Sequence, residues 1–116
     1  MIEDDENFSW LMKQACKEAG LLLDHAPDGS SGFKKAKATK PDLIILDILL
    51  PKMDGISVAN AIRQQGIQSP ILFLTNFKDQ KNILYAAQLL GETPLIKSDV
   101  RIFDIITHVK HRLGIE

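Results

Sequence analysis

The sequence predicts an α/β domain in which helices cover both faces of a parallel β-sheet. Two apolar runs, at residues 43–50 and 70–75, are short enough for strands and lack the alternation of a half-exposed strand. Amphipathic helical patterns separate these runs, and an alternation of strand and helix is typical of parallel α/β sheets. A length of 116 residues corresponds to one domain, so we expect residues 1–116 to form a single unit.

The first predicted helix runs from about residue 8 to Gly20, which ends it. Its apolar residues recur at helical spacing on one face and include Phe8, Leu11, Met12, Ala15, Cys16 and Ala19. Because Cys16 lies on this face, we expect a packed core thiol rather than a reactive one. Residues 21–23 predict a short strand, residues 27–29 a turn, and the region around Phe33 a weaker helix.

The second half of the chain continues the alternation. Asp54 and Gly55 open a helix that Gly66 ends, and the strand at 70–75 follows. Residues 83–90 predict another helix, and residues 94–96 predict an edge strand that begins at its proline. Ile102, Ile105, Ile106, Val109 and Leu113 mark a final helix, with Gly114 just past its end.

Bulk composition excludes several functions. A net charge of −1 and a pI near 6.3 give no electrostatic basis for binding nucleic acid or an anionic membrane. No apolar stretch has the length needed to span a bilayer, and the acidic first residues are unlike a signal peptide. One cysteine cannot form an internal disulfide, which is consistent with the cytoplasm.

Asp47 is a carboxylate within an otherwise apolar run of Leu and Ile residues. Burial of an unpaired carboxylate costs several kcal/mol, so Asp47 should lie at a strand end beside a positive group. Parallel sheets collect ligands beyond the carboxyl ends of their strands. The polar residues at the other predicted strand ends are Glu3, Asp4 (with Asp5), Thr75 and Lys97.

These side chains have the chemistry of a phosphorylation site. Carboxylates this close need a counter-ion, and Mg²⁺ prefers one or two carboxylates together with waters and phosphate oxygens. Lys97 is a point charge suited to a phosphate or to Asp47, and the Thr75 hydroxyl can donate a hydrogen bond to a phosphoryl oxygen. A carboxylate can attack phosphorus to form an acyl phosphate, so we expect Asp47 to be phosphorylated.

Four motifs carry a family resemblance: Glu3-Asp4-Asp5, Asp47 in LIILDILLPKMDG, Thr75 in LFLTN and Lys97 in LIKSD. Over essentially its whole length the chain resembles a response-regulator receiver domain of bacterial two-component signalling, similar to the chemotaxis response regulator. The resemblance implies a flavodoxin-like, doubly wound fold with five parallel strands in the order 2-1-3-4-5 and five helices.

The resemblance also implies a metal site and a phosphoryl donor. Asp47 is expected to accept a phosphoryl group from the phosphohistidine of a sensor histidine kinase or phosphotransfer protein. Asp4 is expected to bind Mg²⁺ directly and Glu3 through water, with the backbone carbonyl of Leu49 completing the protein ligands.

Two further roles and a function class follow from the resemblance. Lys97 is expected to hold an acyl-phosphate oxygen, and Thr75 to move toward the phosphoryl group. The chain is therefore expected to be a cytoplasmic signalling phosphoacceptor rather than an enzyme, one that assists its own phosphorylation and dephosphorylation. Its phosphorylation would switch a protein-interaction surface, without direct binding of nucleic acid or membrane by this domain.

The sequence departs from the family pattern in three places. Only Met1 and Ile2 precede Glu3, where the family has a full central strand, so we expect a weakened or swapped first strand. Either the natural chain begins earlier or another chain completes the sheet. Pro94 replaces an aromatic residue that turns inward on activation. Leu49 and Phe77 are bulky, and we expect them to shield the phosphoryl group from water.

Two other functions compete with this interpretation. An aspartate-nucleophile phosphatase of the haloacid dehalogenase type would carry an acid two residues after the nucleophile, and Leu49 occupies that position. A phosphorylation-independent protein-binding module is favoured by the short first strand and Pro94 but disfavoured by the intact site.

For several residues outside the site, the sequence either predicts a surface position or leaves the position undecided. The last two helices carry Tyr85, Leu89 and Phe103, either as an exposed homodimer patch or as partly buried residues. Trp10 is expected to be partly exposed, and the three histidines are expected at the surface.

Overall fold

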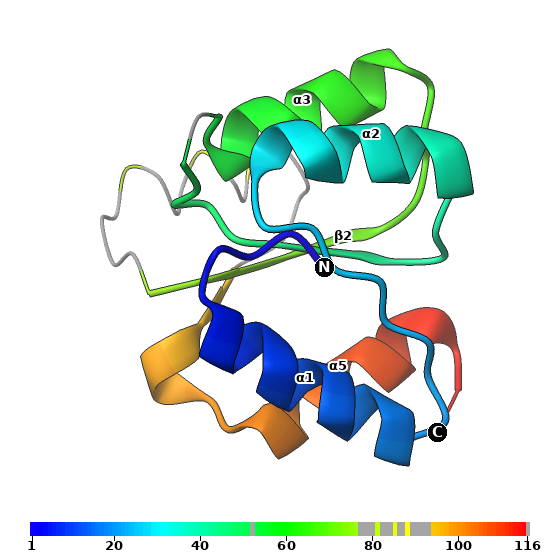
Figure 1. The fold of residues 1–116 in the computed structure, drawn as a ribbon, viewed down its shortest axis with the longest axis vertical. Coiled ribbons are helices and arrows are strands. Elements are labelled where there is room, and N and C mark those ends of the chain that lie inside the picture. Colours follow the sequence, from blue (N-terminus) through cyan, green and yellow to red (C-terminus); the bar gives the residue numbers. More distant parts are fainter. Residues whose placement is uncertain (52, 77–80, 82–84, 86–87, 89–93, 116) are drawn as a thin grey trace.

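The computed structural model describes residues 1–51, 53–76, 81, 85, 88 and 94–115. Within them, helices cover both faces of a parallel sheet (Figure 1). One face carries α1 (Glu6–Glu18) and α5 (Ile102–Leu113), and the other carries α2 (Gly29–Thr39) and α3 (Gly55–Gln64). The strands are β1 (Ile44–Leu46), β2 (Ile71–Thr75) and β3 (Leu95–Ile96), in the order β1-β2-β3.

Ile2 extends the sheet beyond β1. It forms isolated parallel bridges to Leu46 on one side and to Ala26 on the other. The first segment therefore lies between the second and third, which gives the predicted order 2-1-3-4-5. The predicted weakening of the first strand is confirmed, because Ile2 is the residue of this segment that bridges both neighbours in the described structure.

The strand predicted at residues 21–23 is wrong. These residues adopt no regular structure, Leu22 is fully exposed, and the segment bridges the sheet at Ala26 instead. The physical reason is the short first segment: a strand at 21–23 needs a partner, and the chain reaches that side of the sheet through Met1 and Ile2. The helix predicted at 83–90 falls mostly outside the described residues and stays a prediction.

Alternate strand residues point to opposite faces and build two core clusters. Ile2, Ile44 and Leu46 pack toward α2 and α3, whereas Met1 and Ile45 pack toward α1 and α5. Cys16 is buried in the second cluster, as predicted.

Aspartates begin three of the helices. The side chains of Asp5, Asp28 and Asp54 accept hydrogen bonds from backbone N–H groups in the first turns of α1, α2 and α3. The assignment of Asp54 as a helix-starting residue is confirmed. No helix among the described residues has the length and apolar character to cross a membrane.

Candidate functional site

The predicted site residues lie at the carboxyl end of the sheet. Asp47 directly follows β1, Thr75 is the last residue of β2, and Lys97 directly follows β3. Glu3 follows the bridging residue Ile2, so it joins the same edge. Glu3, Asp47 and Thr75 are all buried although each is polar or charged, which calls for partners within the site.

Lys97 supplies the positive partner that the buried Asp47 requires. Its Nζ ammonium donates a 3.0 Å hydrogen bond to Oδ2 of Asp47 and also pairs with Oε1 of Glu3. The ammonium therefore joins two buried carboxylates that are far apart in sequence. The aromatic ring of Phe8, with its centroid 4.8 Å from Nζ, adds a cation–π contact.

Burial and the shared charges of this centre shift the pKa values of Glu3 and Lys97. Burial raises the pKa of Glu3 to about 7, against the lowering effect of the Lys97 hydrogen bond, and the charge of Asp47 adds to the rise. Burial lowers the pKa of Lys97, but the hydrogen bonds and charges of Glu3 and Asp47 together raise it above its usual value. Lys97 is therefore a fixed cation at neutral pH.

The loop after β1 holds the Asp47 carboxylate and backbone in place. Oδ1 of Asp47 accepts a 3.1 Å hydrogen bond from the backbone N–H of Leu49. Gly55 donates its N–H to the carbonyl of Ile48 at 2.8 Å. A Cβ atom on Gly55 would lie 2.1 Å from the carbonyl oxygen of Asp47, so this close approach requires glycine.

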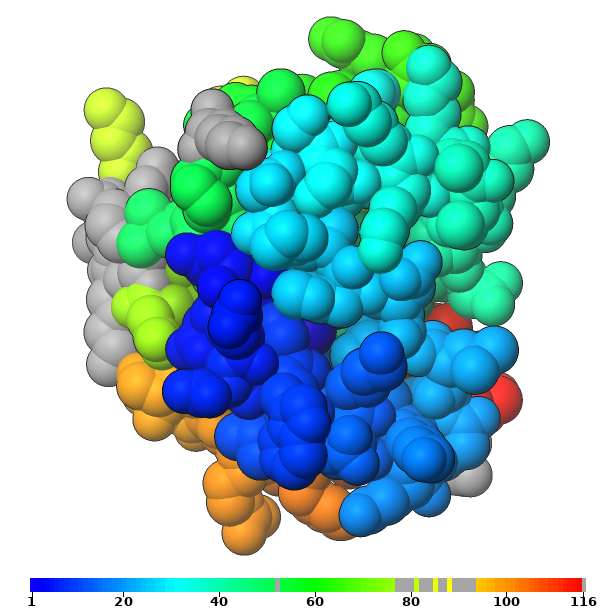
Figure 2. Space-filling model, in the orientation of Figure 1, coloured from blue at the N-terminus to red at the C-terminus, as the bar shows by residue number. Residues whose placement is uncertain are grey.

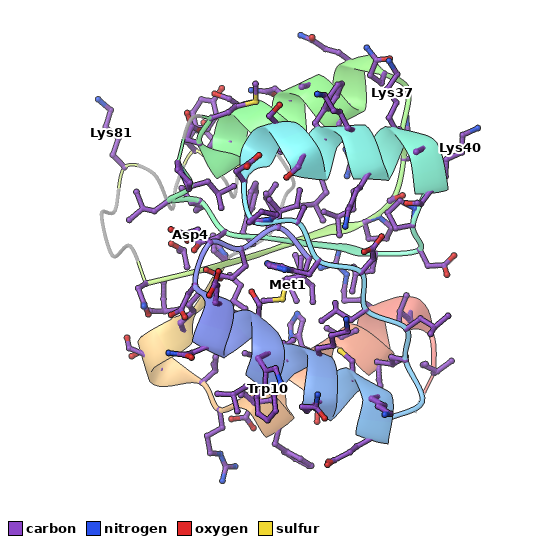
Figure 3. The ribbon with its side chains drawn as sticks, in the orientation of Figure 1. Met1, Asp4, Trp10, Lys37, Lys40 and Lys81 are labelled. Carbon is purple, nitrogen blue, oxygen red and sulfur yellow. The ribbon has the colours of Figure 1, made fainter. Side chains whose placement is uncertain are left out.

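The acidic residues match the donor set of a hard divalent cation. Glu3, Asp4 and Asp47 each offer a carboxylate oxygen, and these atoms lie within 4.8 Å of one another. Asp4, labelled in Figure 3, is exposed, so an ion there would keep water ligands, as Mg²⁺ usually does. The donor chemistry fits Mg²⁺. The structure shows Leu49 bonded through its N–H, and the role of its carbonyl stays a prediction.

Thr75 lies next to the Lys97 strand. In the β2–β3 register Thr75 pairs with Ile96, the residue before Lys97, and its side chain is fully buried. The structure therefore brings Thr75 to the same strand ends as the charged cluster, as the sequence predicts.

His25 and Ser9 support the site and were not predicted. His25 was expected at the surface, but it is partly buried, and its Nε2 lies 2.7 Å from the carbonyl oxygen of Glu3. A carbonyl only accepts, so this nitrogen carries the proton. Ser9 Oγ lies 2.9 Å from the same nitrogen and donates to the carbonyl of Asp5. Nothing in the spacing of His25 or Ser9 indicates these long-range contacts.

The predictions about surface residues are confirmed in part. Trp10 is exposed on the outside of α1 (Figure 3), as expected. Tyr85 and Phe103 are also exposed, so the alternative that these two residues are partly buried in the core is wrong. Leu89 lies outside the described residues, so the homodimer stays a prediction.

Comparisons with known proteins agree with this arrangement. The family described as "Response regulator receiver domain" matches residues 1–108. The alkaline phosphatase synthesis transcriptional regulatory protein PhoP of Bacillus subtilis is 43% identical over 75 residues, which are 65% of this chain and 31% of PhoP. The chain spans less than half the length of the curated relatives it matches.

Solved structures share the fold over nearly the whole chain. A two-component response regulator from Clostridium difficile superposes with a TM-score of 0.88 and 28% identity, covering 97% of this chain and 92% of that one. The response regulator TrrA of Thermotoga maritima, solved in complex with Mg²⁺ and BeF, has a TM-score of 0.81 and 28% identity, covering 97% and 94% of the two chains.

Proposed function

This chain belongs to the response regulator receiver domain family of two-component signalling, and from this premise we propose that Asp47 is its phosphoacceptor. Residues 1–116 act as one receiver domain. The phosphoryl donor is the phosphohistidine of a sensor histidine kinase or phosphotransfer protein. The observation that carries the proposal is the Lys97 ammonium bonded to both buried acids, Glu3 and Asp47.

In the transfer step, a carboxylate oxygen of Asp47 attacks the phosphorus atom of the phosphohistidine. The P–N bond breaks, its electron pair stays on the imidazole nitrogen, and an acyl phosphate forms on Asp47. The N–H of Leu49 fixes the orientation of the carboxylate. Lys97 holds an oxygen of the product, and the hydroxyl of Thr75 donates to a phosphoryl oxygen. Catalysis here is mostly positioning and charge neutralisation.

Glu3, Asp4, Asp47 and the carbonyl of Leu49 are the proposed Mg²⁺ ligands. When bound, the ion supplies positive charge against the carboxylates and the phosphoryl oxygens. The open side of Asp4 supports this assignment, because water ligands have access there.

Phosphorylation would act as a switch in the cytoplasm, where the kinases of this family act. The new charge on Asp47 biases the position of Thr75 and the loops at the strand ends, a local event that changes a protein-binding surface. Dimerisation through the last two helices, with exposed Tyr85 and Phe103, is one form this output can take.

The test is phosphorylation by a small donor. With acetyl phosphate and Mg²⁺, intact mass spectrometry should show the gain of one phosphoryl group per chain. The gain should disappear in Asp47→Asn and when Mg²⁺ is removed with EDTA. Asp42→Asn is the matched control, because Asp42 is an exposed acid next to the same strand and should leave phosphorylation intact.

The other functions give different results in the same experiment. A phosphatase of the haloacid dehalogenase type would turn over a small phosphate ester. A phosphorylation-independent binding module would show no gain of mass. Phosphorylation that persists in Asp47→Asn would contradict the proposal directly.

A further inference from the structure

The backbone that carries the acids Glu3 and Asp4 is held by hydrogen bonds that the transfer chemistry does not use. We call residues 3–5 the acid loop. The N–H of Asp5 donates to Oε2 of Glu3 at 3.1 Å, and the N–H of Glu3 donates to the carbonyl of Ala26 at 3.0 Å. Asp4 itself is exposed, so packing contributes little to its placement. The direction of its side chain therefore depends on the peptide groups on either side of it.

His25 reaches the acid loop from the segment between α1 and α2 (Figure 1). The next residue, Ala26, bridges Ile2 and is buried in the core cluster on the α2 and α3 side. Because neighbouring side chains of an extended segment point to opposite faces, the His25 ring lies on the α1 side, where it contacts Ser9. Its Nε2–H donates a 2.7 Å hydrogen bond to the carbonyl of Glu3.

Ser9 joins His25 to the other side of the acid loop. Its Oγ lies 2.9 Å from Nε2 of His25 and donates a 2.9 Å hydrogen bond to the carbonyl of Asp5. The backbone N–H of Ser9 donates to the same carbonyl at 2.9 Å. Ser9 is 6% exposed, so water has little access to replace these contacts. Together, His25 and Ser9 supply donors to the carbonyl groups of Glu3 and Asp5, the two residues that flank Asp4.

The acid loop needs such restraints because it gathers like charges. Carboxylate oxygens of Glu3, Asp4 and Asp47 lie within 4.8 Å of one another. Without a divalent ion, repulsion between these groups favours a loop in which Asp4 turns away into solvent. A fixed carbonyl opposes this movement, because the peptide group between Glu3 and Asp4 is planar and carries the Cα atom of Asp4 with it. The hydrogen bond from His25 therefore keeps the Asp4 carboxylate near the other two before an ion arrives.

We propose that His25, together with Ser9, is a positioning residue that preorganises the acid loop for Mg²⁺. Both side chains act through the carbonyl groups of Glu3 and Asp5 rather than on the ion. Removal of a partner that orients metal ligands typically weakens metal binding by roughly 10- to 100-fold. This inference rests on the Mg²⁺ site of the proposed function, but it does not require that Asp47 accepts a phosphoryl group.

The test removes and restores the donor at residue 25. His25→Leu has no donor, whereas the side-chain amide in His25→Gln can donate to the Glu3 carbonyl from about the position of Nε2. Calorimetric titration of the unphosphorylated full chain with MgCl₂ should give a dissociation constant roughly tenfold higher for His25→Leu. The value should return toward that of wild type in His25→Gln. His111→Leu, which changes an exposed histidine of α5, is the matched control and should bind Mg²⁺ as wild type does.

Two further measurements separate positioning from a general loss of stability. In the metal-free chain, amide hydrogen exchange at Asp5 should be faster in His25→Leu, because this N–H is bonded to the Glu3 carboxylate. Exchange at the core residue Leu46 should not change. With acetyl phosphate, the Mg²⁺ concentration for half-maximal phosphorylation should rise, while the rate at saturating Mg²⁺ stays close to that of wild type.

Ser9→Ala is a smaller change that removes the second donor, and it should weaken Mg²⁺ binding in the same direction even if His25→Leu does not fold. An unchanged dissociation constant in a folded His25→Leu or in Ser9→Ala would overturn the proposal, even where Asp47 is phosphorylated. A loss of affinity that His25→Gln does not restore would assign His25 to packing, which also overturns it. A wild type that binds no Mg²⁺ would overturn it together with the metal site. A restored tenfold loss supports it, even if Asp47 then gains no phosphoryl group and the proposed function fails.

Discussion

Each end of the sheet holds a lysine–aspartate ion pair. The N–O distance is the same in both pairs, but their surroundings differ. At the carboxyl end, Lys97 lies 3.0 Å from Asp47, and their side chains are 10% and 6% exposed. At the amino end, Lys35 lies 3.0 Å from Asp24, with side chains 47% and 68% exposed. The distance alone therefore says little about what each pair does.

The difference lies in packing rather than in charge. The carboxyl end encloses its charges between strand ends, with Glu3, Phe8 and Leu49 contacting Lys97 or Asp47. The amino end leaves its pair open to solvent, because the Lys35 and Asp24 side chains lie on the surface. Figure 2 shows the first residues between α1 and α2. Charges in water are screened, whereas buried charges depend on each other. The pair at the carboxyl end therefore depends on its protein neighbours, whereas the pair at the amino end interacts mainly with solvent.

The largest expected effect comes from removing one lysine at each end. Lys97→Met leaves Glu3 and Asp47 buried without their counter-ion, so the free energy of unfolding in EDTA at pH 7 should fall by about 3 kcal/mol. Lys35→Met removes an exposed pair and should cost less than about 1 kcal/mol. Urea denaturation measures both. Equal losses would show that the two pairs do not differ in the way their burial implies.

Glycine substitutions give the second comparison. Gly55→Ala brings Cβ against the carbonyl oxygen of Asp47, a backbone atom, and should destabilise the chain by about 2–3 kcal/mol. Gly32→Ala meets the side chain of Ile2, and the better helix propensity of alanine offsets about 1 kcal/mol. Thermal unfolding should therefore rank Gly55→Ala as the more damaging change. The reverse order would mean that Ile2 is held more rigidly than the Asp47 loop.

The two ends should also respond to pH in opposite directions. Burial raises the pKa of Glu3 in the folded state to about 7, above its ordinary value of 4.5. Protonated Glu3 therefore stabilises the fold below pH 4.5, and this contribution to the free energy of unfolding is lost as the pH rises toward 7. The pKa of Asp24 is lowered by its hydrogen bond from Lys35, so its contribution is lost as pH falls. Without Mg²⁺, the free energy of unfolding of the wild type should fall by at most about 1.4 kcal/mol per pH unit between pH 5 and 7, relative to that of Glu3→Gln. Urea denaturation at each pH measures both proteins. Parallel pH profiles of the two proteins would exclude this role for Glu3.

The smallest effect is expected at the rim of the site. Leu49 donates its backbone N–H to the Asp47 carboxylate, and the residue itself is 51% exposed. Leu49→Asn keeps the backbone contact but replaces the apolar shield, so the phosphorylated state should decay several-fold faster. The decay of phosphorylated protein after removal of acetyl phosphate measures this lifetime. An unchanged lifetime would leave Leu49 without a shielding role.

The sequence predicted the carboxyl end far better than the amino end, for a physical reason. Asp47 within an apolar run demands a buried counter-charge, and strand ends in a parallel sheet must converge, so Lys97 and Glu3 could be placed together. The contacts of His25 and Ser9 depend on how α1 packs, which no local pattern records. The strand predicted at 21–23 failed because its pairing depends on a neighbour rather than on its own leucines.

The ion pair between Lys97 and Glu3 joins residues that are far apart in the sequence. During synthesis on a ribosome, Glu3 and Asp47 emerge before their ammonium partner Lys97. A nascent chain that stops before residue 97 therefore lacks the cation that pairs with both buried carboxylates, so this end of the sheet can close only after Lys97 has been added.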